Sequence, residues 1–188
     1  LDPCCGAGTI AIEAAQIACG IAPGLHRRFA FEKLMPFRDH LRAWREMKEA
    51  AEAGVHAPAV PIWAGDVSFR MTDFATRNAE RAGVLGAIDF KTADALQRPA
   101  PAAAGTILMN PPYGERIGEQ DELAAFYPEL GSALKKHWAG WNCFFFTADL
   151  RLPKLVGLKP SRKTPLFNGP LECRLFEIRM VAGSNRKV

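Results

Sequence analysis

The chain alternates between short apolar runs and longer segments with helical periodicity, and this order restricts the possible folds. Four segments carry the spacing or length of helices: 9–19, 37–51, 70–82 and 123–138. Four short apolar runs are typical of buried strands: 59–66, 86–94, 105–110 and 141–149. Strands that alternate with helices through short connections form α/β domains with a mostly parallel sheet.

The two ends of the pattern refine this prediction. The segment 171–181 alternates apolar and charged residues, which is typical of an antiparallel strand, and a short helix is expected over 149–156. At the other end, the glycine turn before residue 9 should follow a buried strand, of which only Leu1 remains. We therefore expect one domain over 1–188 with a Rossmann-like fold. It would have a seven-stranded, mostly parallel sheet, one antiparallel strand, helices on both faces and a truncated first strand at the centre.

Composition excludes several classes of protein. The 188 residues are 48% hydrophobic and 23% charged, an ordinary globular balance that argues against disorder. No apolar run approaches the roughly 20 residues that a membrane helix needs. The five cysteines are odd in number and form no Cys-x-x-Cys pair, which argues against a disulfide framework and a zinc site. We expect a cytoplasmic protein without metal or membrane attachment; its net charge of +4 is compatible with a polyanionic partner.

The segment LDPCCGAGTIAIEAA places Asp2, Gly6 and Gly8 directly before a predicted helix. Glycines allow close approach of a ligand to the backbone, and the helix N-terminus offers free N–H donors. The pattern Gly6-x-Gly8-x-x-Ala11 weakly fits a dinucleotide fingerprint. That fingerprint requires a ribose-binding acid about 20 residues further on, where the chain has LHRRF instead.

S-adenosylmethionine fits the acidic residues better than a dinucleotide does. Asp2, Asp66 and Asp94 each stand at the carboxyl end of a predicted strand, where open α/β sheets bind ligands. Asp2 could accept a hydrogen bond from the amine of the cofactor, Asp66 from both ribose hydroxyls, and Asp94 from the adenine amino group. A single aspartate is more often a helix cap or a solvated side chain, but three in register favour the cofactor.

The stretch LMNPPYGERIG, at 108–118, ends another predicted strand. The lone pair of an exocyclic base amine is delocalised, so a methyltransferase must orient that nitrogen. The side-chain oxygen of Asn110 and the carbonyl of Pro111 can each accept one N–H, which fixes the angle of attack. Pro111 and Pro112 stiffen the loop, and Tyr113 offers a ring on which a flipped-out base can stack.

Several segments together resemble one family of enzymes. DPCCGAGTIAIEAA, APGLHR, RNAERAG, NPPYGERIG and LFNGPLECRLF are similar to bacterial THUMP-associated RNA methyltransferases, from residue 1 to about 181. The nearest resemblance is to the class I enzymes that methylate the guanine 2-amino group of 23S rRNA. The resemblance implies an RNA-binding THUMP domain upstream. One departure is Ser68, where relatives often have a second acid after the ribose acid.

The resemblance also assigns roles to residues. The catalytic loop would be Asn110 to Tyr113. The residues that it implies for cofactor binding are Asp2, Pro3, Gly6, Gly8, Thr9, Asp66, Val67, Asp94 and Ala95. Basic and aromatic residues near these motifs are candidates for RNA contact, although a solvated surface is an equal alternative. These candidates are Arg27, Arg28, Arg116, Arg162, Lys163, Phe167 and Asn168.

Three classes of function stay open on the residues alone. The favoured one is methylation of a guanine in 23S rRNA or an assembly intermediate of the ribosome. The same chemistry could act on adenine in DNA or on a protein glutamine, because Asn-Pro-Pro-Tyr suits any planar amine. A non-enzymatic RNA-binding or dinucleotide-binding module is the third class, and the intact Asn-Pro-Pro-Tyr argues against it. The sequence does not define the oligomeric state.

Overall fold

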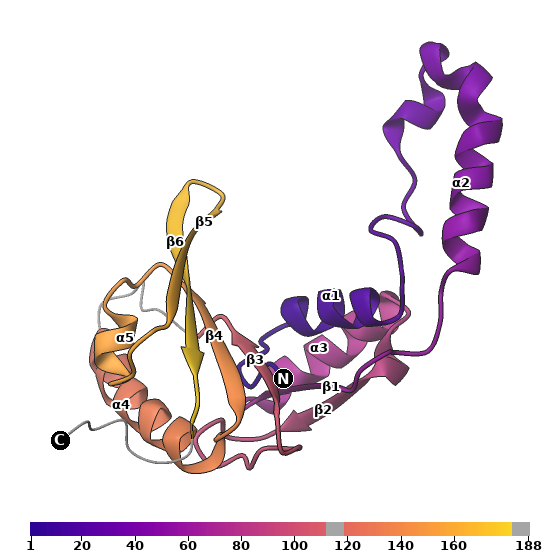
Figure 1. The fold of residues 1–188 in the computed structure, drawn as a ribbon. Coiled ribbons are helices and arrows are strands. Elements are labelled where there is room, and N and C mark those ends of the chain that lie inside the picture. The colour runs from indigo at the N-terminus through magenta and orange to yellow at the C-terminus, as the bar shows by residue number, and fades with distance from the viewer. Residues whose placement is uncertain (112–118, 182–188) are drawn as a thin grey trace.

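The structure is a computed structural model that describes residues 1–111 and 119–181. Helices and strands alternate along most of the chain, as the periodicity predicts (Figure 1). The α-helices are α1 (Thr9–Ala18), α2 (Leu41–Ala53), α3 (Phe69–Arg81), α4 (Glu119–His137) and α5 (Leu152–Leu155). Short 3-10 helices are η1 (Ala30–Lys33), η2 (Met35–His40) and η3 (Leu85–Ala87).

The strands form two hydrogen-bonded groups. In the first, β1 (Ile62–Asp66) pairs in parallel with β2 (Ile88–Thr92). In the second, β3 (Gly105–Met109) pairs in parallel with β4 (Trp141–Thr147), and β6 (Leu171–Arg179) runs antiparallel to β4. The last strand, β5 (Arg162–Asn168), pairs antiparallel with β6 and forms a hairpin with it. The antiparallel strand expected over 171–181 is therefore confirmed.

The first two residues of the chain join the two groups of strands. Asp2 forms a parallel bridge with Ala64 of β1, and its N–H donates to the carbonyl of Trp63 at 3.0 Å. On the opposite side, the N–H of Leu108 in β3 donates to the carbonyl of Leu1 at 3.0 Å. The segment Leu1–Asp2 thus lies between β1 and β3, at the centre of the arrangement.

Helices cover both faces of this arrangement, as expected. Neighbouring residues of a strand point to opposite faces, and in β1 they enter different hydrophobic clusters. Ala64 is fully buried in the cluster beneath α1 and α3, whereas Trp63 packs against the cluster that contains Leu130 and Leu134 of α4. The larger cluster, on the α4 side, holds most of the fully buried aromatic side chains.

Three features differ from the sequence-based expectation. The described residues form six strands in two groups, with two parallel and two antiparallel pairs, so a single seven-stranded, mostly parallel sheet is not what the structure shows. The strand β5 was not predicted, because six of its seven residues are exposed and no alternation marks it. Finally, α2 covers neither face of the strands and projects from the body (Figure 1).

None of the helices formed by the described residues is long and apolar enough to cross a membrane.

Candidate nucleotide-cofactor site

The glycine turn has the backbone geometry that its sequence predicts. Gly6 and Gly8 adopt positive φ angles of 51° and 89°, which L side chains rarely adopt. The N–H of Gly8 donates to the carbonyl of Cys5 at 2.8 Å, which closes the turn before α1 begins at Thr9. A Cβ atom on Gly8 would meet the Cβ of Ala75 in α3 at 3.0 Å, whereas one on Gly6 would meet nothing within 4 Å. The missing side chain at Gly6 therefore leaves open space beside the turn.

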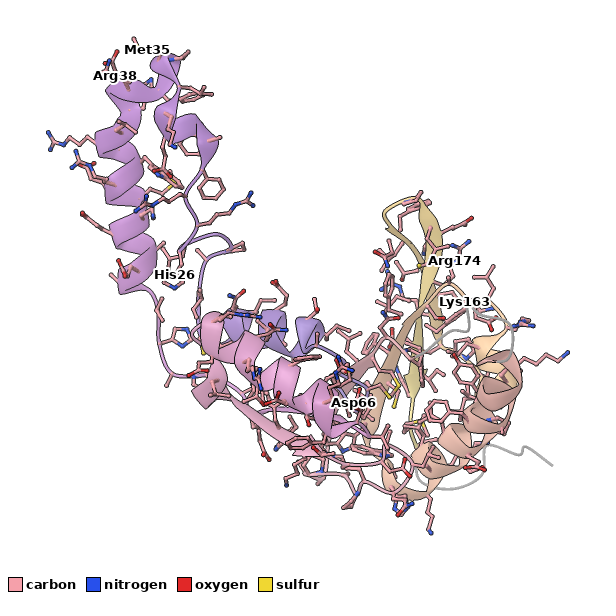
Figure 2. All side chains as sticks on the ribbon, turned by 180° about the vertical axis from the view of Figure 1, so that it is seen from behind. His26, Met35, Arg38, Asp66, Lys163 and Arg174 are labelled. Carbon is pink, nitrogen blue, oxygen red and sulfur yellow. The ribbon has the colours of Figure 1, made fainter. Side chains whose placement is uncertain are left out.

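Asp66 ends β1 and reaches back to the glycine turn. One carboxylate oxygen accepts a hydrogen bond from the N–H of Gly6 at 3.1 Å, and the other accepts from the N–H of Ser68 at 2.9 Å. Each oxygen retains a second lone pair, so the carboxylate can still accept from a ligand. The side chain is half-buried beside the turn (Figure 2).

Asp2 is buried directly before the turn. Its carboxylate accepts a hydrogen bond from the N–H of Cys4 at 3.2 Å, and its side chain is among the few buried charged ones in the described residues. Burial raises the pKa of Asp2 to about 7, which the hydrogen bond from Cys4 partly opposes. A cationic group placed next to Asp2 would favour its ionised form.

Asp94 follows β2, and its carboxylate accepts from the N–H of Leu96 at 2.9 Å. Burial, with smaller contributions from the charges of Asp2, Asp66 and Asp94, raises the pKa of the Cys4 thiol to about 12. The N–H of Gly65 donates to the carbonyl of Asp2 at 2.9 Å, and the N–H of Ala93 donates to the carbonyl of Asp66 at 3.0 Å, so the three acids lie at neighbouring strand ends.

Asn110 and Pro111 follow β3, the strand that pairs with Leu1. Asn110 is exposed and Pro111 is buried, so the asparagine lies at an accessible edge next to the strand end that carries Asp2. Pro112, Tyr113 and Arg116 lie outside the described residues.

The remaining cofactor candidates lie at the same ends of the strands. Pro3 is buried within the turn, and Thr9 is the exposed first residue of α1. Val67 directly follows β1 with 73% of its side chain exposed, and Ala95 is buried next to Asp94. An exposed apolar side chain beside the acids is consistent with contact to a flat ligand.

The structure does not bring the candidate RNA-contacting residues together. Arg27 and Arg28 directly follow His26, which lies near the base of the projecting α2 segment (Figure 2). The guanidinium of Arg27 lies over the ring of Phe29, 5.4 Å from its centroid. Arg162, Lys163, Phe167 and Asn168 lie on the exposed β5 strand of the hairpin, where Phe167 is 68% exposed. The candidates therefore form two separate surfaces.

Three further residues lie at the site or fix its backbone, and they were not predicted. The side-chain amide of Asn78 in α3 donates to the carbonyl of Ala7 at 2.8 Å and so fixes the glycine turn. Arg98, which is 7% exposed, donates to the carbonyl of Ala64 in β1 at 3.1 Å. Cys4 lies among the acids. Sequence spacing could not identify Asn78 or Arg98, because each donates to a backbone carbonyl that is distant in the sequence.

Chemically, the site presents hydrogen-bond acceptors to its ligand. Carboxylates at three strand ends can accept from an amine, from hydroxyls and from an aromatic amino group. The same negative charges oppose a pyrophosphate at the glycine turn. The geometry therefore fits a nucleoside cofactor with a cationic tail better than it fits a dinucleotide.

Comparisons with known proteins agree with this geometry. The model of the family described as the RMKL-like methyltransferase domain matches residues 1–177. The ribosomal RNA large subunit methyltransferase K/L of Shewanella baltica is 43% identical over 193 residues, which cover 100% of the chain and 27% of that protein. The chain thus spans about a quarter of the length of this curated relative.

Two solved structures share the fold over nearly the whole chain. A possible methylase from Clostridium difficile is 34% identical with a TM-score of 0.88, over 98% of this chain and 48% of that one. The putative methyltransferase SMU.472, solved in complex with SAH, is 30% identical with a TM-score of 0.86, over 97% of this chain and 48% of that one. The chain belongs to the RMKL-like methyltransferase domain family.

Proposed function

We propose that this chain transfers a methyl group from S-adenosylmethionine to the 2-amino group of a guanine in large-subunit rRNA. The observation that carries the proposal is the placement of Asp2, Asp66 and Asp94 at neighbouring strand ends near the glycine turn, with Asn110 at the end of the next strand. When bound, the cofactor supplies a methyl group activated by a sulfonium charge, so the protein needs chiefly to bind and orient the two reactants.

The acids bind the cofactor in this proposal. Asp2 accepts from the amine of its amino-acid tail, Asp66 from the ribose hydroxyls and Asp94 from the adenine amino group. The open space beside Gly6 accommodates close approach to the backbone. The complex of the similar protein SMU.472 with SAH, the demethylated form of the cofactor, supports the choice of S-adenosylmethionine.

Asn110 and Pro111 act on the substrate. Each contributes one acceptor oxygen to the target amine, so that its lone pair points away from the base ring and toward the methyl group. Tyr113 stacks on the flipped-out base. Because the amine needs orientation more than deprotonation, none of the three acids has to act as a general base.

The substrate assignment rests on the relatives. The Shewanella protein is named a large-subunit rRNA methyltransferase, and RNA is the partner that we propose here. The hairpin adds Arg162 and Lys163 for phosphates and the exposed ring of Phe167 for a base. We propose that an RNA-binding domain outside these 188 residues supplies further contacts.

We further propose that a strand preceding Leu1 in the full-length protein completes the sheet as its seventh strand. A cavity of about 470 Å³ continues from Leu1 between the two groups of strands. It is lined by Ile62 and Trp63 of β1 on one side and by Gly105 and Thr106 of β3 on the other. The cavity has apolar walls, and the strand edges on its two sides offer backbone groups for pairing. An extended, apolar segment would fill the cavity and pair with both edges.

Nucleoside mass spectrometry of rRNA from cells that lack the protein tests the substrate. Loss of one 2-methylguanosine from large-subunit rRNA, restored by the wild-type gene, is the expected result. Unchanged rRNA together with lost methyladenine in DNA or methylglutamine in a protein would refute the substrate assignment and leave the chemistry of Asn110 in place.

A further inference from the structure

A helical arm, defined here as residues 25–56, projects from the body of the molecule. It comprises η1, η2 and α2, and none of these helices contains a buried residue. The 13 residues of α2 make it about 20 Å long. Figures 1 and 2 show that the arm and the β5–β6 hairpin rise from the same side of the strands as two separate projections.

The arm is held together by its own aromatic cluster. Phe29, Phe31, Phe37 and Trp44 lie with ring centroids 5.1 to 5.6 Å apart. Glu32 adds a hydrogen bond from the N–H of Phe29 at 2.9 Å. These contacts lie within the arm itself, so it forms a preshaped element that does not depend on covering the sheet.

The base of the arm is tied to the end of α1. The N–H of His56 donates to the carbonyl of Cys19 at 2.9 Å, and the N–H of Ala59 donates to the carbonyl of Ala18 at 2.8 Å. The chain therefore leaves and re-enters the body at one place, and the tip is displaced from the strand ends that carry the acids.

The tip of the arm, defined here as residues 33–45, carries an excess of positive charge. Residues 33–45 contain Lys33, Arg38, Arg42 and Arg45 but only one acid, Asp39. Arg42 pairs with Glu46 at 2.9 Å. Arg38 donates to the sulfur of Met35, and Arg45 to the carbonyl of Leu41, so neither forms an ion pair within the part of the chain that the structure describes.

The tip also exposes apolar side chains next to these cations. Met35 is 70% exposed and Phe37 is 43% exposed, and Figure 2 shows Met35 and Arg38 together at the far end of the arm. A surface that combines unpaired arginines with flat or flexible apolar side chains suits phosphates and unstacked bases. A second copy of the same tip would meet it with like charge.

We propose that the tip of the arm binds the phosphate backbone of the RNA substrate at a position remote from the methylated base. This inference rests on the proposed function and adds a second RNA-contacting surface to the hairpin. Together, the two projections would hold the RNA at two points, with the strand ends that bear Asp66 between them (Figure 2).

The test is the salt dependence of RNA binding by the full-length protein with the double substitution Arg38→Gln and Arg45→Gln. Loss of two phosphate contacts should make the negative slope of log K against log salt shallower by about 1.4 to 1.8 and raise the Kd roughly tenfold at 0.1 M salt. The matched control replaces Lys135 and Lys136 by Gln, because both are exposed cations in the last turn of α4. The control should leave the slope unchanged. The probe is a transcript of large-subunit rRNA.

Cofactor affinity and thermal unfolding of the arm variant should match those of the wild type, because the arm contributes no residue to the site around Asp2, Asp66 and Asp94. An unchanged slope and Kd in the arm variant would overturn the proposal while leaving methylation, and hence the proposed function, intact. A change in oligomeric state without a change in RNA affinity would assign the tip to self-association and also overturn it. If the wild-type protein neither binds nor methylates the transcript, the proposed function fails as well.

Discussion

The carboxylate of Asp66 accepts a hydrogen bond from the N–H of Gly6 at 3.1 Å, across 60 residues of sequence. The end of β1 and the glycine turn are therefore one structural unit, in which the acid fixes the turn that it faces. We therefore expect a ligand at this turn to contact Asp66, and a change at Asp66 to affect both ligand binding and the turn.

Replacing Asp66 by alanine should weaken the binding of S-adenosylmethionine. Two charge-assisted hydrogen bonds to the ribose would be lost, and each is typically worth roughly 1.5–3 kcal/mol. Isothermal titration calorimetry on the full-length protein measures the effect. Asp39→Ala is the control, because Asp39 is exposed on the arm. Equal affinity in the Asp66 variant and the control would mean that another residue binds the ribose.

Cofactor affinity should rise with pH up to about 7. Burial raises the pKa of Asp2 to about 7, so below that pH the Asp2 carboxyl of the folded protein is mostly protonated. Binding of a cationic amine to ionised Asp2 must release that proton, so affinity should increase by up to tenfold per pH unit between about 5.5 and 7. Asp2→Asn should remove this dependence. A wild-type affinity that is flat over this range would exclude the role of Asp2.

The same pKa predicts how stability varies with pH. Between the unfolded value of 3.8 and the folded value of about 7, the unfolded state holds fewer protons. The contribution of Asp2 to the free energy of unfolding therefore falls as pH rises through this window. Chemical denaturation measures the free energy of unfolding at pH 5 and pH 7.5. This free energy should fall less between the two pH values in Asp2→Asn than in the wild type. An equal fall in both proteins would contradict the raised pKa of Asp2.

Gly8→Ala should destabilise the fold more than Gly83→Ala does. Both glycines have positive φ angles, so each substitution incurs about 1 kcal/mol of backbone strain. A Cβ at position 8 would also press against the Cβ of Ala75 at 3.0 Å, whereas one at position 83 would meet nothing within 4 Å. Urea denaturation compares the two. Adding Ala75→Gly should restore part of the free energy of unfolding lost in Gly8→Ala, and should restore none of that lost in Gly83→Ala.

The sequence allows the elements and acids to be predicted because both depend on local patterns. Periodicity identifies α1, α3, α4 and β6, and the rule that ligands bind at the carboxyl ends of strands singles out Asp2, Asp66 and Asp94, which the structure places at neighbouring strand ends. Asn78 and Arg98 escape prediction, since each stabilises the site through a backbone carbonyl that only the tertiary fold brings near.

The position of α2 and the existence of β5 also could not be predicted. The apolar spacing of α2 is correct, but periodicity does not say which surface the apolar face contacts, and here it faces the aromatic residues of its own arm. Within the part of the chain that the structure describes, strand β5 pairs only with β6, and six of its seven residues are exposed, so neither burial nor alternation marks it.

Tyr113→Ala should weaken productive capture of the target base by about 1–3 kcal/mol if stacking on the ring is its main contribution. Tyr113→Phe should have a mild effect, because the ring face carries this role. Single-turnover methylation at varied RNA concentration separates capture from chemistry. If Tyr113→Ala and Tyr113→Phe weakened capture of the base equally, the role would belong to the hydroxyl and not to the ring.

The orienting role of Asn110 is the central claim, and the most direct measurement is 2-methylguanosine in large-subunit rRNA incubated with the full-length Asn110→Ala variant and S-adenosylmethionine. Because the proposal places Asn110 on the target amine and not on the cofactor, its loss should abolish product formation while cofactor affinity, measured in parallel, stays near the wild-type value. A variant that forms 2-methylguanosine at the wild-type rate would contradict the mechanism.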